Sequence, residues 1–264
     1  RDMRSQIGNK SNNPRYFKYI SYDEALDFVE RYDYPATVSM HTFATHTATL
    51  KFKSNKTNPN VPVLGIDSNY PITSGQEIGE GRNFSESEVY YGSHVAIIGT
   101  NIRKQLFDDN ENAVGKTISI GPGKYRVVGV LKEKGSSIGF SGDRFCLLPV
   151  NNVRQYFSAP NRSFTINVMV NDPTKLDEAI GEATGTFRIV RGDLPGKEDS
   201  FSITKSDEIV NMIEDNLSKI KWAAIIIGLI TLLGAAIGLM NIMLVSVTER
   251  TQEIGIRKAM GANR

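Results

Sequence analysis

The chain has 264 residues, with 31 Lys and Arg against 29 Asp and Glu. A formal charge of +2 lacks the strong basic excess that is typical of nucleic-acid-binding proteins, so we exclude that class. The single cysteine, Cys146, rules out an internal disulfide framework and any multi-cysteine metal site. We therefore expect Cys146 to fill part of the core.

The first 34 residues predict a lead-in followed by a short helix. Residues 1–20 show no clear hydrophobic period, and we expect an exposed, partly disordered segment there. Ser21 and Glu24 have the spacing of a capping box, in which each side chain binds the backbone N–H of the other residue. The helix that they begin should end near Pro35, because proline does not continue a helix.

Residues 35–204 predict an α+β domain with a mixed sheet. The run 37–53 alternates between apolar and polar residues, which is typical of long or bent strands with one face in water. Further strands are predicted at 61–66, 95–98, 117–120, 125–131, 145–148 and 164–170, and helices at 101–107, 151–157 and 175–189. We expect residues 68–150 to form an inserted β-rich subdomain, with the strands on either side of it belonging together.

The sequence contains no set of residues that predicts catalysis. Gly115, Lys116 and Thr117 match the end of a phosphate-binding loop, but Asn110 stands where that motif needs glycine, and strand-like residues follow. His41 and His46 are five residues apart in a predicted strand, which would place them on opposite faces. We therefore expect a non-enzymatic chain with no metal and no cofactor.

Residues 222–248, between Lys221 and Glu249, carry no charge. As a helix these 27 residues would measure about 40 Å, enough to cross a hydrocarbon core of about 30 Å. Trp222 lies where an aromatic residue at the membrane interface is expected, and the basic tail places the C-terminal side in the cytoplasm.

Within this span, Gly234 and Gly238 would let another helix approach closely. Asn241 needs a polar partner in hydrocarbon and is expected to face another helix rather than lipid. The sequence thus indicates that partner helices exist.

The apolar period begins before the span. From residue 209, apolar residues recur at spacings of three and four, and no Pro or Gly separates them from the span. These residues are Ile209, Met212, Ile213, Leu217 and Ile220. We predict one unbroken helix over 206–248, about 65 Å long, within a stalk and membrane segment at 205–248. Residues 249–264 should form a cytoplasmic segment.

The run GLMNIMLVSVTERTQEIGIRKAMGA at 238–262 closely resembles the signature of MacB-like ABC transporter permeases, within the wider FtsX-like group. Upstream blocks are similar to that family's periplasmic core domain and occur in the same order, at 66–67, 79–84, 95–99, 114–118 and 127–130. The resemblance covers nearly the whole chain from about Ser21.

This resemblance implies an inner-membrane, multi-pass permease with four membrane helices and a large periplasmic domain between the first two. The chain would then begin after the first helix and stop before the third. It also implies a fused or separate ABC ATPase, a homodimer or paired permease, and in many relatives a periplasmic adaptor and an outer-membrane channel. Such transporters resemble levers, in which stalk helices relay ATP-driven movement across the lipid bilayer.

The family's segment that contacts the ATPase matches residues 249–261 here. It includes the residues that we expect to couple to the ATPase: Glu249, Arg250, Glu253, Ile254, Ile256, Arg257 and Lys258. Gln252 stands where the family often has Arg. Without the resemblance, binding of this basic tail to lipid headgroups would be an alternative.

We predict a permease that transmits ATPase movement to a periplasmic domain for efflux or export. Two alternatives stay open: a permease for lipoprotein release, and an FtsX-like regulator of cell-wall hydrolases. The neighbouring genes would distinguish them.

Overall fold

The computed structural model describes residues 17–108, 111–133 and 142–261, and it describes side chains in these ranges except at 207–216. Residues 1–16 of the predicted lead-in lie outside the described residues. So do the side chains of three predicted stalk residues, Ile209, Met212 and Ile213. The chain divides into two compact units, the larger over residues 15–202 and the second over 203–264.

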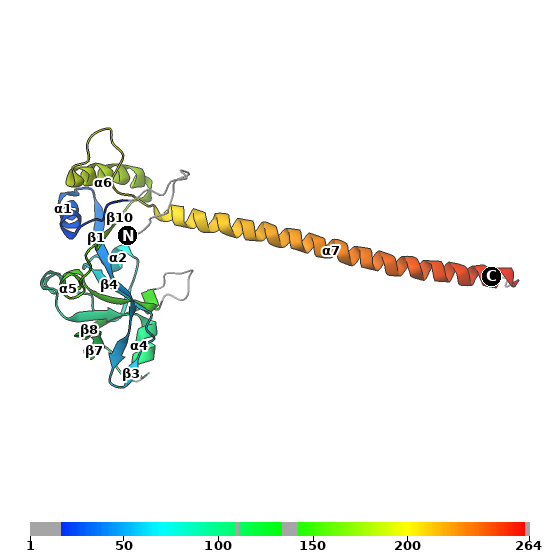
Figure 1. Cartoon of the computed structure of the whole chain (residues 1–264), viewed down its shortest axis with the longest axis horizontal. Coiled ribbons are helices and arrows are strands. Elements are labelled where there is room, and N and C mark those ends of the chain that lie inside the picture. The colour runs from blue at the N-terminus through cyan, green and yellow to red at the C-terminus, as the bar shows by residue number, and fades with distance from the viewer. Residues whose placement is uncertain (1–16, 109–110, 134–141, 262–264) are drawn as a thin grey trace. The chain divides into compact units, whose positions relative to one another are not determined.

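Described residues of the larger unit form both strands and helices, with the first four strands in direct succession (Figure 1). The strands are β1 (Ala36–Ala48), β2 (Leu50–Phe52), β3 (Asn55–Lys56), β4 (Val61–Ile66), β5 (Ile78–Gly81), β6 (Val95–Ile98), β7 (Thr117–Ile120), β8 (Gly123–Leu131), β9 (Cys146–Pro149) and β10 (Thr165–Val170). The α-helices are α1 (Tyr22–Arg31), α2 (Tyr70–Thr73), α3 (Glu86–Tyr91), α4 (Thr100–Leu106), α5 (Val150–Tyr156) and α6 (Leu176–Arg191), with single 3-10 turns η1 (Gly142–Arg144) and η2 (Pro173–Lys175).

The strands form one mixed sheet, in the order β10-β1-β4-β9-β6-β8-β7-β2-β3, with β5 also paired to β8. The β4–β9 and β6–β8 pairs are parallel, whereas β1 pairs antiparallel with both β4 and β10. This confirms the predicted α+β class and mixed sheet. The sheet joins β4 to β9, which lies inside the range 68–150, so a separate subdomain there stays a proposal.

Strand β1 is bent by two shifts of register against β4, one between Phe43 and Thr45 and one between Thr45 and Ala48. Such bulges disturb the alternation of side chains. The ring centroid of Phe43 lies 6.3 Å from that of His41 and 4.4 Å from that of His46. The prediction that the two histidines lie on opposite faces is therefore wrong, because simple alternation does not hold across a bulge.

Helix α1 begins as the sequence predicts. The Ser21 hydroxyl accepts a bond from the Glu24 N–H at 3.2 Å, and the Ser21 N–H donates to Glu24 Oε2 at 2.8 Å. Phe28 of the helix and Tyr32, directly after it, are buried in a cluster with Phe187 of α6. Helices α1 and α6 thus pack together beside β1 (Figure 1).

Residues 17–20 are not the exposed lead-in that the sequence predicts. The Ile20 N–H donates to Ser163 Oγ at 3.3 Å, and the Phe164 N–H donates to the Ile20 carbonyl at 2.9 Å. These partners lie more than 140 residues away in sequence, so no local pattern indicates them.

The core centres on the middle strands, where Ile97 and Leu147 are fully buried. Gly99, directly after β6, shows how closely the backbones pack: a Cβ there would lie 2.3 Å from the Asp143 carbonyl oxygen. The fully buried Cys146 confirms the expectation that this residue fills the core. Desolvation raises the pKa of its thiol well above the usual value.

The predicted strands and the helices predicted at 101–107, 151–157 and 175–189 all occur, with ends that differ by one or two residues, whereas the first helix ends at Arg31 rather than near Pro35. The short elements β3, β5, α2 and α3 were not predicted from the sequence. Helix α3 begins with a second capping box, Ser85 and Glu88, so a local signal was available there.

Candidate functional site: the long helix and its attachment

In its described residues the second unit forms one helix, α7 (Ser206–Ala259), of 54 residues. At 1.5 Å per residue it is about 81 Å long, and it continues without interruption through Lys219–Ala223 (Figure 1). The unbroken helix is therefore confirmed, and it extends eleven residues beyond the predicted end at 248. No proline occurs in this range, and Lys258 near its end interacts favourably with the helix dipole.

Residues Leu217–Ala259 of α7 are long and apolar enough to cross a membrane. Their large apolar side chains are exposed within the chain: Leu232 is 69% exposed and Met243 is 66% exposed. Exposure of this apolar surface to water would cost a free energy of about 25 cal/mol for each Å². Lipid or other helices must therefore cover it. The predicted stalk residues Leu217 and Ile220 are also exposed, at 55% and 65%.

Gly234, Gly238 and Asn241 occupy one side of α7, since spacings of four and three return to the same face of a helix. Among the described residues, the hydroxyls of Thr231 and Thr248 donate to carbonyls of the preceding turn, at 2.5 and 3.0 Å. The structure gives the Asn241 amide no such bond within the described chain. Its position is therefore consistent with a partner outside this chain.

The C-terminal end of α7 is charged and exposed. Arg250 Nη1 lies 3.5 Å from Glu253 Oε2, and these side chains are 77% and 57% exposed. Ile254 and Ile256 are exposed beside them, at 63% and 52%. In water such a pair contributes at most about 1 kcal/mol. Both charged groups therefore stay available to a binding partner.

Successive residues of an α-helix are rotated by about 100° around its axis, and this rotation places two groups of α7 residues on different faces. The glycine and asparagine face and the face with Arg250, Glu253 and Arg257 lie roughly 125° apart. Because of this separation, α7 can pack against another helix on one side and present charges to a different partner on the other. Glu249 and Ile256 lie beside the first face, whereas Lys258 lies beyond the second.

The residues just before α7 are anchored in the larger unit, which the sequence does not predict. Phe201 is 7% exposed and packs at 4.7 Å, ring to ring, on Phe187 of α6. Only Ser202–Lys205 separate it from the start of α7, and four residues span at most about 14 Å when fully extended. The one available signal was a single aromatic residue before the stalk period.

The remaining candidates for chemistry have structural roles. Gly115–Thr117 lead directly into strand β7 rather than into a helix, so they do not form a phosphate-binding loop. Burial raises the pKa of Asp67 to about 6, but its carboxylate accepts the N–H groups of Met40 and Tyr70 at 2.8 and 2.9 Å. Burial lowers the pKa of His41 to about 4. No group of metal-ligating side chains occurs among the described residues.

Comparison with known families matches both parts of the chain. The MacB-like periplasmic core domain matches residues 1–186, and the FtsX-like permease C-terminal region matches residues 225–264. The second match includes all of the predicted coupling residues.

Similar curated proteins are named macrolide export ATP-binding/permease protein MacB. The one from Neisseria meningitidis serogroup A is 30% identical over 247 residues, which is 94% of this chain and 37% of the relative. The one from Chromobacterium violaceum is 34% identical over 210 residues, covering 77% of this chain and 30% of the relative. The chain thus spans about a third of the length of these relatives.

Solved structures share the fold of the larger unit. The periplasmic region of MacB from Actinobacillus actinomycetemcomitans has a TM-score of 0.62 at 21% identity, covering 79% of this chain and 90% of that one. The extracellular domain of the ABC-type transporter YknZ from Gram-positive bacteria has a TM-score of 0.54 at 19% identity, covering 72% and 98%.

Proposed function

The chain belongs to the MacB-like periplasmic core domain family, and we propose that it transmits ATPase movement across a membrane to that domain for efflux. It matches the permease part of its relatives, and the family implies an ATPase partner. The family match and the apolar helix together describe a membrane-anchored protein with a periplasmic domain.

The observation that carries the proposal is the continuity of α7. A helix bends sharply only where its backbone hydrogen bonds are interrupted. Because α7 runs uninterrupted from Ser206 to Ala259, a displacement at its charged end should reach its other end instead of being absorbed. In this proposal the stalk and membrane helix at 205–248 continues without a break into the coupling segment, because α7 extends to Ala259.

The proposed ATPase contact is the exposed end with Arg257 and Lys258. We propose that Gly234, Gly238 and Asn241 pack against a membrane helix of a second permease copy. We propose that the permease lies in the inner membrane, and that a periplasmic adaptor and an outer-membrane channel complete the assembly. Export is favoured over lipoprotein release and hydrolase regulation because the names of the relatives specify macrolide export.

The ATPase contact is tested by reversing both charges, Arg257→Glu and Lys258→Glu, and measuring co-purification with the ATPase. We expect recovery of the ATPase to fall by at least about tenfold, since close charge pairs across interfaces contribute about 1.5 kcal/mol or more. The matched control reverses Lys116 and Lys124, which are exposed in the larger unit, with the same change of net charge. Equal recovery from both variants would refute the proposed contact.

Efflux is tested in cells that express the transporter, with a labelled macrolide as the probe. We expect ATP-dependent reduction of the accumulated label. Accumulation equal to that of cells without the transporter would refute macrolide efflux.

A further inference from the structure

We propose that Arg191, on the last turn of α6, is a positioning residue that joins the segment before α1 to the segment before α7, so that both respond to movement of α7 together. The structure brings these segments to one guanidinium although they lie at opposite ends of the larger unit in sequence. This inference rests on the proposed function, because it specifies where transmitted movement enters the core domain.

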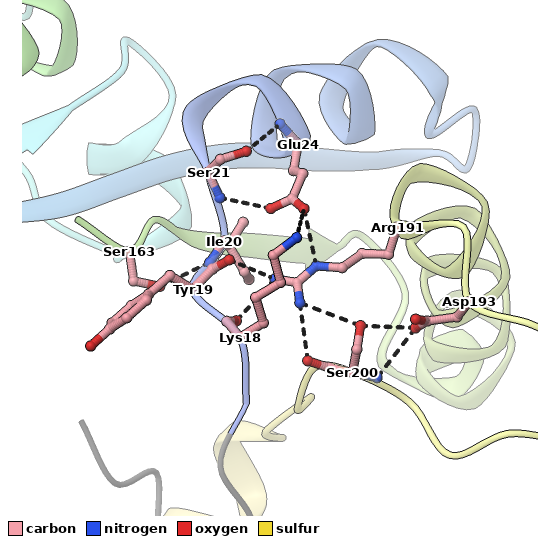
Figure 2. A network of polar contacts seen from close by, with 9 residues as sticks. All are labelled: Lys18, Tyr19, Ile20, Ser21, Glu24, Ser163, Arg191, Asp193 and Ser200. Carbon is pink, nitrogen blue, oxygen red and sulfur yellow. Dashed lines mark hydrogen bonds and ion pairs between the residues drawn. The ribbon is translucent and has the colours of Figure 1, made fainter. Parts of the chain in front are cut away.

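The guanidinium makes contacts in three directions (Figure 2). Nη2 donates to the carbonyls of Lys18 and Tyr19, each at 3.0 Å. Nη1 donates to the carbonyl and the hydroxyl of Ser200, at 3.1 and 3.3 Å. Nε lies 3.5 Å from Glu24 Oε1, and the Arg191 side chain is only 2% exposed.

Only arginine can make this set of contacts. Its planar group directs five N–H donors outward in a fixed fork, whereas lysine has one compact charge at the end of a flexible chain. A buried cation without partners is strongly destabilising. The native arrangement therefore requires both segments to be in place at once, and loss of one leaves donors of Arg191 unpaired.

The Ser200 side of the junction is reinforced by its neighbours. Asp193 Oδ2 accepts bonds from the N–H and the hydroxyl of Ser200, at 3.2 and 2.9 Å. Burial acts to raise the pKa of Asp193, but these bonds from Ser200 and the nearby Arg188 and Arg191 hold it below its usual value. The carboxylate thus stays ionised near neutral pH. Arg188 also pairs with Asp199.

Movement of α7 reaches this junction through a short link. Phe201 is buried next to Ser200, and α7 begins five residues later at Ser206. A pull on the link must either break the contacts of residues 199–201 or move the larger unit with it. Because Arg191 also holds residues 18–19, force on Ser200 acts on the segment before α1 as well.

The experiment is hydrogen exchange measured by mass spectrometry on the assembled transporter in detergent, with peptides that cover 17–21 and 199–202. For Arg191→Gln we expect exchange in both segments to accelerate by about tenfold. For Asp193→Asn we expect acceleration at 199–202 and a smaller acceleration at 17–21, because loosening Ser200 reaches residues 18–19 only through Arg191. Arg82→Gln removes a comparable bidentate arginine, bonded to Glu88 at 2.7 Å, and should change neither segment.

Acceleration of only one segment in the Arg191→Gln protein would overturn the proposal, as would no change in either. If Arg191→Gln fails to fold, Arg191→Lys provides the same comparison with the charge retained, and it should release both segments as well. A second readout is the ATP-driven response of a label on the core domain, which Arg191→Gln should abolish while ATP hydrolysis continues. A wild-type protein without that response would refute the proposed function, whereas the exchange data would still decide the role of Arg191.

Discussion

Replacing Ile213 with proline tests whether transmission requires an unbroken α7. Proline removes the N–H that bonds to the carbonyl of residue 209 and its ring clashes with that carbonyl, at a cost of about 3 kcal/mol. The helix is expected to kink by at least about 20° there. From Ile213 to Ala259 the helix has 46 further residues, or about 69 Å, so this kink displaces the far end by about 24 Å relative to a straight helix.

The assay uses a fluorescent label on the core domain of the reconstituted transporter. Tyr91→Cys introduces a thiol at a position that is 72% exposed, while Cys146 is fully buried. We expect ATP to change the label's emission in the parent protein. The Ile213→Pro protein should lose that response and retain membrane insertion and ATP hydrolysis.

Ser206→Pro is the matched control. Ser206 is the first residue of α7, where proline is tolerated because the N–H has no partner within the helix. The preceding Lys205 is already extended, with φ −82° and ψ 143°, as the residue before proline prefers. This control should respond like the parent. A normal response from the Ile213→Pro protein would refute the reasoning that a straight helix carries the movement.

Three further predictions concern the core, a surface ion pair and the membrane helix. Ile97→Ala should lower the free energy of unfolding by about 2–5 kcal/mol, measured by urea denaturation. The control Ile72→Ala, at a position that is 55% exposed, should have little effect. Equal losses of stability in the two variants would contradict the assignment of the core. The bonds from Arg82 hold the pKa of Glu88 at about 2, below its ordinary 4.5, so the contribution of Glu88 to stability is present above about pH 4.5 and is lost as the pH falls towards 2. In the Arg82→Gln protein the midpoint of unfolding should therefore depend less on pH between 4.5 and 2. An unaltered pH dependence would argue against the pair. Asn241→Leu should weaken association between α7 helices by about 1 kcal/mol, measured by energy transfer in vesicles, and unchanged association would place Asn241 away from the interface.

Local sequence patterns determined the elements that depend on local interactions. The capping box at Ser21 and Glu24 satisfies backbone groups within one turn, so the start of α1 could be predicted. The charge-free run 222–248 and the absence of proline predict a long apolar helix. The end of that helix was less well defined, because the sequence offers a glycine at both 255 and 261, and α7 continues through Gly255 to Ala259.

Tertiary structure decided features that depend on partners distant in sequence. The bulges in β1 arise from its pairing with β4, and they place the His41 and His46 rings on one phenylalanine. Arg191 binds carbonyls 172 and 173 residues away; in the sequence it is one of 31 basic residues. Helical and capping patterns recur within a few residues and are visible in the chain itself, whereas the partners of a buried arginine exist only after the sheet and helices have brought both segments together.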